Sequence, residues 1–326
     1  MHPQRVIRLV VEPTLVPEFD RDKAYQLYEA VISPIASSLN GKKHIIFLPD
    51  GALQKIPLQI ALDRKDDRWL VQRYAVTTMP SLNALLATRE SHQSSRATKG
   101  FLGVGAPDFS AYSRVHDENS VGSAGALSRL LADLQPLPEA ASELRQMGNL
   151  FSSPEVTLEL GDRATKQVFI SAPPTEYRNI VFATHAIMAG EAGLDEPAIV
   201  LFPDGGSVSD GLLTASEIAL LRLDAELVIL SACNTAAPDG GPYAEGLSGL
   251  ARAFMHAGAR SMLVSHWAAP RKSTPMITTG FMTAIRGDPT LRKAEALRSA
   301  ILPLLKSGDV ELEHPAYWAP FIVVGE

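Results

Sequence analysis

Short, almost continuously apolar runs recur along the chain, and they constrain its fold more than any other feature of the sequence. Each run is rich in aliphatic residues and stops at turn residues or at a polar residue. Six runs share this character: His44–Leu48, Phe101–Val104, Ile180–Ala183, Leu227–Leu230, Ser261–Val264 and Phe321–Val324. Such runs are typical of β-strands that are covered on both faces of a sheet.

Helical patterns lie between these runs. Apolar residues recur at helical spacing from Tyr25 to Ile32 and from Leu247 to Ala257. Thr214-Ala215-Ser216-Glu217 has the spacing of a capping box, and Asp288-Pro289 has the pattern of an N-cap that opens a helix through Leu305. Strands that alternate with helices predict an α/β fold with a mainly parallel sheet flanked by helices, because parallel neighbours need a crossover connection.

The charge and hydropathy of the chain exclude several partners. The formal net charge is −6, and no run of basic residues is longer than Lys42–Lys43, so we expect no direct contact with nucleic acid. No apolar stretch reaches the roughly 18 residues of a membrane span, and the first residues lack the apolar core of a secretion signal. We therefore expect a cytoplasmic protein that does not bind a membrane.

A single cysteine and an incomplete glycine motif limit the chemistry of bound groups. Because Cys233 is the only cysteine, the chain cannot form an internal disulfide or a multi-thiolate metal site. Gly103 and Gly105 resemble part of a dinucleotide-binding motif, but the third glycine and the acidic residue of that motif are missing. We expect no cofactor and no metal.

Residues 106–135 separate two parts of the chain. They are rich in Ser, Gly and charged residues, and their periodicity is weak before Leu127. This composition is typical of a long connection. We expect residues 1–24 to be a lead-in, residues 25–135 to form an N-terminal half that includes the connection, and residues 136–326 to form a C-terminal half. A processing site or flap within the connection is the alternative to an ordinary linker.

Two apolar runs stop at residues that could act together in catalysis, His185 and Cys233. The carboxyl ends of parallel strands are where sites collect in α/β sheets. A thiol is mostly protonated at neutral pH and needs a neighbouring base to act as a nucleophile. The histidine comes first, about 50 residues upstream, which is the order and spacing of caspases. The alternatives are a structural histidine with a buried packing cysteine, or His266 as the base.

Longer stretches carry a more specific signal: GKKHIIFLPDGALQKIPLQIAL (41–62), VQRYAVTTMPSLNALL (71–86), NIVFATHA (179–186), DGLLTASEIALLRLDAELVILSACNTA (210–236), EGLSGLARAFMHAGARSMLVSHW (245–267) and HPAYWAPFIVVGE (314–326). At these residues the sequence resembles the CHAT domain family, caspase-like cysteine peptidases of clan CD that are related to separase. The resemblance extends from about Tyr25 to the end of the chain.

This resemblance implies a caspase-like fold with a non-catalytic N-terminal half and a catalytic C-terminal half. It implies that His185 is the general base and Cys233 the nucleophile that forms an acyl-enzyme. The backbone N–H groups of Ala186 and Cys233 would supply the oxyanion hole. Glu245 and Gly246 match the segment that shapes the loop behind the cysteine.

The sequence departs from the family pattern at two places. Ala186 stands where the family usually has glycine after the catalytic histidine, which suits only a backbone that does not require positive φ. The segment after Trp267 carries Arg271 and Lys272 where relatives often carry acidic residues. A basic substrate side chain would lack a partner there, so we expect an acidic or apolar P1 residue, bound near Trp267 and Arg271. The alternative is that Arg271 points to solvent.

The resemblance also implies a biological setting. It implies a regulated endopeptidase that cleaves a protein substrate, in bacterial antiviral defence or cell death. CHAT domains commonly follow tetratricopeptide (TPR) or other sensor modules, so we expect a sensor or TPR-containing partner, or a missing N-terminal region. The alternative function is a catalytically weak CHAT module that acts as a protein-interaction scaffold. An acyltransferase or amidase is disfavoured, because Cys233 lacks the flanking glycines of a nucleophile elbow.

Overall fold

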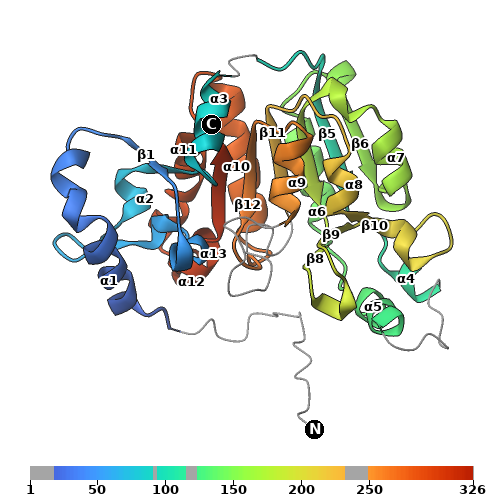
Figure 1. Cartoon of the computed structure of the whole chain (residues 1–326), viewed down its shortest axis with the longest axis horizontal. Coiled ribbons are helices and arrows are strands. Elements are labelled where there is room, and N and C mark those ends of the chain that lie inside the picture. The colour runs from blue at the N-terminus through green and yellow to red at the C-terminus, as the bar shows by residue number, and fades with distance from the viewer. Residues whose placement is uncertain (1–17, 91–93, 115–122, 232–248, 326) are drawn as a thin grey trace, which may run out of the picture.

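The computed structural model describes residues 18–90, 94–114, 123–231 and 249–325. Figure 1 shows a central sheet with helices on either side of it. The sheet has eight strands in the order β1 (His44–Phe47), β4 (Ala75–Thr78), β13 (Phe321–Gly325), β12 (Ser261–Ser265), β11 (Leu227–Ser231), β7 (Tyr177–Ala183), β5 (Lys99–Gly105) and β6 (Val156–Leu160).

All neighbouring strands of this sheet run parallel except β12 and β13, which are antiparallel. The predicted α/β fold with a mainly parallel sheet is confirmed. All six strands predicted from apolar runs are present. The prediction missed β4 and β6, because the Thr residues of β4 and the Thr and Glu of β6 interrupt the apolar pattern.

Alternate residues of the central strands face opposite sides of the sheet, as a two-residue side-chain period requires. On β11, Leu227 and Ile229 belong to one core cluster, and Val228 and Leu230 to another. The first cluster includes residues of α6 (Ala140–Gly148), α10 (Thr274–Gly287) and α11 (Lys293–Ile301). The second includes residues of α7 (Lys166–Ser171), α8 (Ala215–Ala219) and α9 (Gly249–Ala257). The buried sheet therefore has two apolar faces, each covered by helices.

Smaller elements complete the described structure. A three-stranded sheet consists of β10 (Leu212–Thr214), β9 (Ala198–Val200) and β8 (Ala186–Ile187), and a two-stranded ribbon of β2 (Leu62–Asp63) and β3 (Arg68–Trp69). The remaining α-helices are α1 (Arg21–Val31), α2 (Leu70–Arg73), α3 (Leu82–Glu90), α4 (Ser110–Arg114), α5 (Ser123–Ala132), α12 (Val310–Glu313) and α13 (Pro315–Trp318). In the described part of the chain, no helix combines the length and apolar character that crossing a membrane requires.

The capping-box prediction at Thr214 is confirmed. Thr214 Oγ1 accepts a hydrogen bond from the backbone N–H of Glu217 at 3.3 Å, and the Glu217 carboxylate accepts one from the Thr214 N–H at 2.9 Å. These reciprocal bonds satisfy two of the N–H groups that every helix start leaves without a helical partner.

The predicted N-cap at Asp288 is wrong. The helix α10 continues through Gly287, and Asp288 follows its last residue. The Asp288 carboxylate accepts hydrogen bonds from the Thr290 N–H at 2.9 Å and from Thr290 Oγ1 at 2.6 Å. Because this turn uses the carboxylate locally, the next helix begins only at Lys293.

Residues 106–135 are more ordered than a plain connection. They contain α4 and α5, and Phe109, Tyr112 and Leu131 are buried in a core cluster with residues of β8, β9 and β10. The predicted connection thus includes two helices that pack against the fold, and residues 115–122 lie outside the described part. The segment joins strands of one sheet, since β5 before it pairs with β6 and β7 after it. The division of the chain at residue 135 stays a prediction.

Candidate functional site

The carboxyl ends of four neighbouring strands meet at one edge of the sheet. Ser231, the last residue of β11, is paired with Ala183, the last residue of β7, and Gly105 of β5 is paired with Ala183 from the other side. A pocket opens at this edge between the strand ends and the helices α6 and α10. His185 and Arg271 both line it.

The imidazole of His185 is held from two directions. Its Nε2 lies 2.8 Å from the carbonyl oxygen of Gln135, and its ring packs against Phe109 with 4.8 Å between the ring centroids. A carbonyl oxygen only accepts hydrogen bonds, so Nε2 carries the hydrogen and donates it. In the neutral ring this leaves Nδ1 as the basic atom.

The surroundings of His185 favour its neutral form. Burial lowers the pKa of His185 below its ordinary value of 6.5, and the positive charge of Arg271 lowers it further, while the hydrogen bond to Gln135 opposes these effects. A histidine with a lowered pKa is uncharged at neutral pH and can accept a proton.

The backbone at His185 is fixed by β9. The Thr184 hydroxyl donates to the carbonyl of Val200, and the Val200 N–H donates to the His185 carbonyl at 2.9 Å. These two bonds hold the chain where it leaves β7 and enters β8. The orientation of the imidazole thus follows from a fixed backbone as well as from its side-chain contacts.

Ala186 occupies its position without backbone strain. It lies in β8, paired with Ile199 of β9. Among the described residues, the non-glycine positions with positive φ are Asp67, Ala106 and Ala192. The backbone after His185 therefore does not require glycine, and alanine presents its N–H there as glycine would.

The end of β5 lies close against the end of β7. The Ala106 N–H donates to the Ala183 carbonyl at 2.9 Å, and a Cβ atom at Gly105 would lie only 2.2 Å from the same oxygen. Ala106 itself has a left-handed backbone with φ of 51°. This close approach directs the chain toward Phe109 and the face of His185, so Gly105 is explained by packing between strands.

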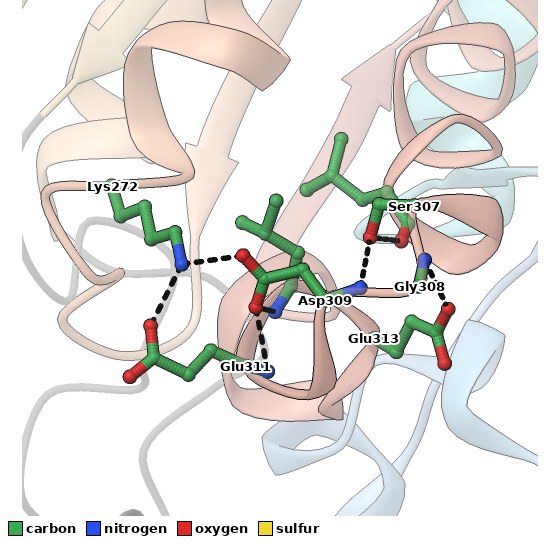
Figure 2. Close-up of polar contacts among 8 residues, drawn as sticks. Lys272, Ser307, Gly308, Asp309, Glu311 and Glu313 are labelled. Atoms are coloured by element: carbon green, nitrogen blue, oxygen red, sulfur yellow. Dashed lines mark hydrogen bonds and ion pairs between the residues drawn. The ribbon is translucent and has the colours of Figure 1, made fainter.

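Arg271 and Lys272, the two cations of the segment after Trp267, have different surroundings. Arg271 lines the pocket. Lys272 donates to Asp309 at 2.6 Å and to Glu311 at 2.9 Å, as Figure 2 shows. These two carboxylates raise the pKa of Lys272 well above its ordinary value. Arg271 therefore supplies the positive charge that this segment brings to the pocket.

Trp267 and His266 contact other parts of the fold and do not line the pocket. The Trp267 Nε1–H donates to the carbonyl of Ala316 at 3.3 Å, and the indole packs against the core. His266 donates its backbone N–H to Pro320 at 2.9 Å, and burial lowers the pKa of its imidazole to about 4. Neither residue is among those that line the pocket. Of the two histidines that follow strands β7 and β12, the pocket includes His185.

Sequence reasoning missed two carboxyl groups at the pocket, Glu139 and Glu143, which lie just before and within α6. Glu139 is exposed and Glu143 is buried. The signal was available at Glu143, because it shares the apolar face of the helix with Ala140, Leu144 and Met147. Three residues that the sequence analysis singled out, Cys233, Glu245 and Gly246, lie outside the described residues.

The sequence of this chain is similar to a known domain family and to two longer proteins. A model of the CHAT domain matches residues 21–326. Tetratricopeptide repeat protein 28 of Homo sapiens is 24% identical over 96% of this chain, and its Mus musculus counterpart is 24% identical over 92%. The chain spans 13% of the length of each of these relatives.

Solved structures share the fold. The Arg-specific cysteine proteinase gingipain R superposes with a TM-score of 0.53 at 9% identity, covering 94% of this chain and 66% of that chain. A structure described as a protease superposes with a TM-score of 0.51 at 12% identity, covering 97% of this chain and 70% of that chain. At these identities the likeness is one of fold alone. The sequence match over residues 21–326 is decisive for the family: the chain belongs to the CHAT domain family.

Proposed function

We propose that this chain is a caspase-like cysteine endopeptidase domain in which His185 is the general base and Cys233 the nucleophile. The observation that carries the proposal is the environment of His185 beside the end of β11. Its Nε2–H is engaged by the Gln135 carbonyl, its Nδ1 is the basic atom, and its pKa is lowered. This is the protonation state that a base needs to accept a thiol proton at neutral pH.

Strand register supports a short distance between the two residues. His185 follows Ala183 by two residues and Cys233 follows Ser231 by two residues, and Ala183 and Ser231 are paired in adjacent parallel strands. Two residues of chain span at most about 7 Å. This register supports the proposal that Cys233 acts at the same edge of the sheet as His185.

The proposed reaction uses these groups in two stages. The thiol proton of Cys233 moves to Nδ1 of His185, and the thiolate sulfur bonds to the carbonyl carbon of the substrate. The C–N bond breaks as the imidazolium returns its proton to the leaving amine, and water then hydrolyses the thioester with His185 as base. The N–H groups of Ala186 and Cys233 are proposed to stabilise the oxyanion.

We propose an acidic or apolar P1 residue, with Arg271 as the partner of an acidic one. Arg271 lines the pocket, whereas Lys272 is neutralised by Asp309 and Glu311. A basic P1 side chain would be desolvated beside the guanidinium, which costs binding free energy. Glu139 also lines the pocket, and because it and Arg271 are both exposed, water screens both charges.

A peptide library with a randomised P1 position tests activity and specificity together. We expect cleavage by the wild-type chain after acidic or apolar residues and none by Cys233→Ala or His185→Ala. Arg271→Ala should reduce cleavage after acidic P1 residues by about tenfold or more, the scale of a lost charged hydrogen bond, and leave apolar P1 residues little affected. Dominant cleavage after Arg or Lys would contradict the specificity, and activity of the Cys233→Ala variant would contradict the mechanism.

A second candidate function is a protein-interaction scaffold with weak or no catalysis. The observation that favours it is that the relatives are named for tetratricopeptide repeats and that this chain spans 13% of the length of each. A TPR-containing partner or a longer chain is therefore part of the proposal. If the library is not cleaved while such a partner is bound, the scaffold is the better account. The expected role in bacterial defence or cell death stays a prediction.

A further inference from the structure

A buried carboxyl group lies beside the pocket and has no part in the proposed reaction. Glu143 lies on the apolar face of α6 and is 3% exposed. Its neighbours on that face, Ala140, Leu144 and Met147, are core residues. Moving a carboxylate from water to such surroundings is costly unless it is neutralised, and burial raises the pKa of Glu143.

The two hydrogen-bond contacts of the Thr278 hydroxyl are compatible with a protonated Glu143. Thr278 Oγ1 lies 2.7 Å from Glu143 Oε1 and 2.9 Å from the carbonyl oxygen of Thr274. A hydroxyl group has one hydrogen, so it cannot donate to both oxygens. If Glu143 carries a proton, its O–H donates to Thr278 Oγ1, and Thr278 donates to Thr274. The single hydrogen of Thr278 is then used once, and both contacts remain hydrogen bonds.

The same carboxyl group reaches the strand that precedes the proposed nucleophile. Ser231, the last residue of β11, lines the pocket together with Glu143, and a hydrogen bond from its side chain opposes the rise in the pKa of Glu143. Cys233 follows it by two residues in the sequence. Glu143 therefore joins three elements, α6, α10 and the end of β11.

We propose that Glu143, as a protonated acid, is a positioning residue that fixes the end of β11 and so the start of the segment that carries Cys233. This inference rests on the proposed peptidase function. It assigns Glu143 no contact with substrate. An ionised Glu143 would instead be a candidate partner for a basic P1 residue. Glu143→Gln would preserve the positioning role and abolish the role as a charged partner.

Glutamine separates these roles because it resembles the neutral acid. Its side-chain N–H can donate to Thr278 Oγ1, and its oxygen can accept from Ser231. Methionine has a similar length but makes neither bond. The matched control is Gln146→Ala, an exposed position on the same helix.

The first measurement is the rate at which a peptide electrophile labels Cys233, the only thiol of the chain. We expect Glu143→Gln and Gln146→Ala to label within about threefold of wild type, and Glu143→Met at least about tenfold more slowly. If the methionine variant does not fold, Thr278→Val, which removes the relaying hydroxyl, should show the same loss. Labelling of Glu143→Gln as slow as that of Glu143→Met would overturn the proposal, as would unchanged labelling of Thr278→Val.

The second measurement is the melting temperature against pH, which does not depend on catalysis. The titratable and charged groups around Glu143 that line the pocket are Glu139, His185 and Arg271, and all are retained in the glutamine variant. A carboxyl group whose folded pKa is raised contributes stability that is complete below its ordinary value of 4.5 and is lost as pH rises through the folded pKa. Glu143→Gln should therefore gain stability relative to wild type as pH rises. An identical pH dependence would refute the protonated acid, even if no peptide is cleaved and the proposed function fails.

Discussion

At the scale of single residues, the site is organised around the imidazole of His185. Phe109 and Gln135 contact this ring, and both come from the segment that the sequence predicted as a linker. Burial is the largest cause of the lowered pKa of His185, so the residues that exclude water from the ring set its protonation state. The pKa of the proposed base is therefore lowered by packing from a segment distant in sequence.

Truncating Phe109 should expose His185. We expect Phe109→Ala to raise the pKa of His185 toward 6.5, because water reaches the ring, and to destabilise the fold by roughly 3 kcal/mol. NMR titration of the imidazole measures the pKa. The matched control is Leu131→Ala, a buried residue of the same cluster, which should cost similar stability and leave the pKa unchanged. Equal pKa values in wild type and Phe109→Ala would contradict this account.

At the scale of elements, the junction of β5 and β7 directs the chain over the site. Gly105 has no room for a side chain, because the Ala183 carbonyl passes 2.2 Å from the position of a Cβ atom. The next residue, Ala106, has a left-handed backbone and bonds to the same carbonyl. Strain of this kind persists only where the surrounding structure over-determines the conformation.

Adding one methyl group should test this junction. Gly105→Ala is expected to destabilise the protein by at least about 2 kcal/mol, because two strands must separate to admit it. The control is Gly287→Ala at the end of α10, where a Cβ atom would meet nothing within 4 Å. Chemical denaturation of both variants measures the difference. A Gly105→Ala protein as stable as Gly287→Ala would show that the strands are not in close contact.

The elements also show what sequence reasoning can reach. Six strands of the sheet and the capping box at Thr214 were predictable, because their signals are local patterns. The helices α4 and α5 were not, because their apolar residues are stabilised by contacts with β8, β9 and β10. Local patterns placed His185 correctly at a strand end. They could not reveal Gln135 or Phe109, which reach the site through tertiary packing, whereas the apolar face of α6 carried a signal for Glu143.

At the scale of the whole molecule, one mainly parallel sheet brings distant segments to a single edge. The order β12, β11, β7, β5 places four carboxyl ends side by side, and α6 and α10 border the pocket beyond them. The fold likeness to gingipain R covers 94% of the chain. We propose that this edge of the sheet pairs His185 with Cys233.

The most direct test is the pH dependence of alkylation of Cys233 by iodoacetamide, since the chain has no other cysteine. We expect wild type to react at neutral pH at least about tenfold faster than His185→Ala. The reaction rate of wild type should rise with pH around an inflection below the ordinary thiol pKa of about 8.5, whereas the inflection of His185→Ala should lie at about 8.5. His266→Ala should behave as wild type. Equal rates and inflections in wild type and His185→Ala, or loss of reactivity in His266→Ala alone, would contradict the pairing of His185 with Cys233.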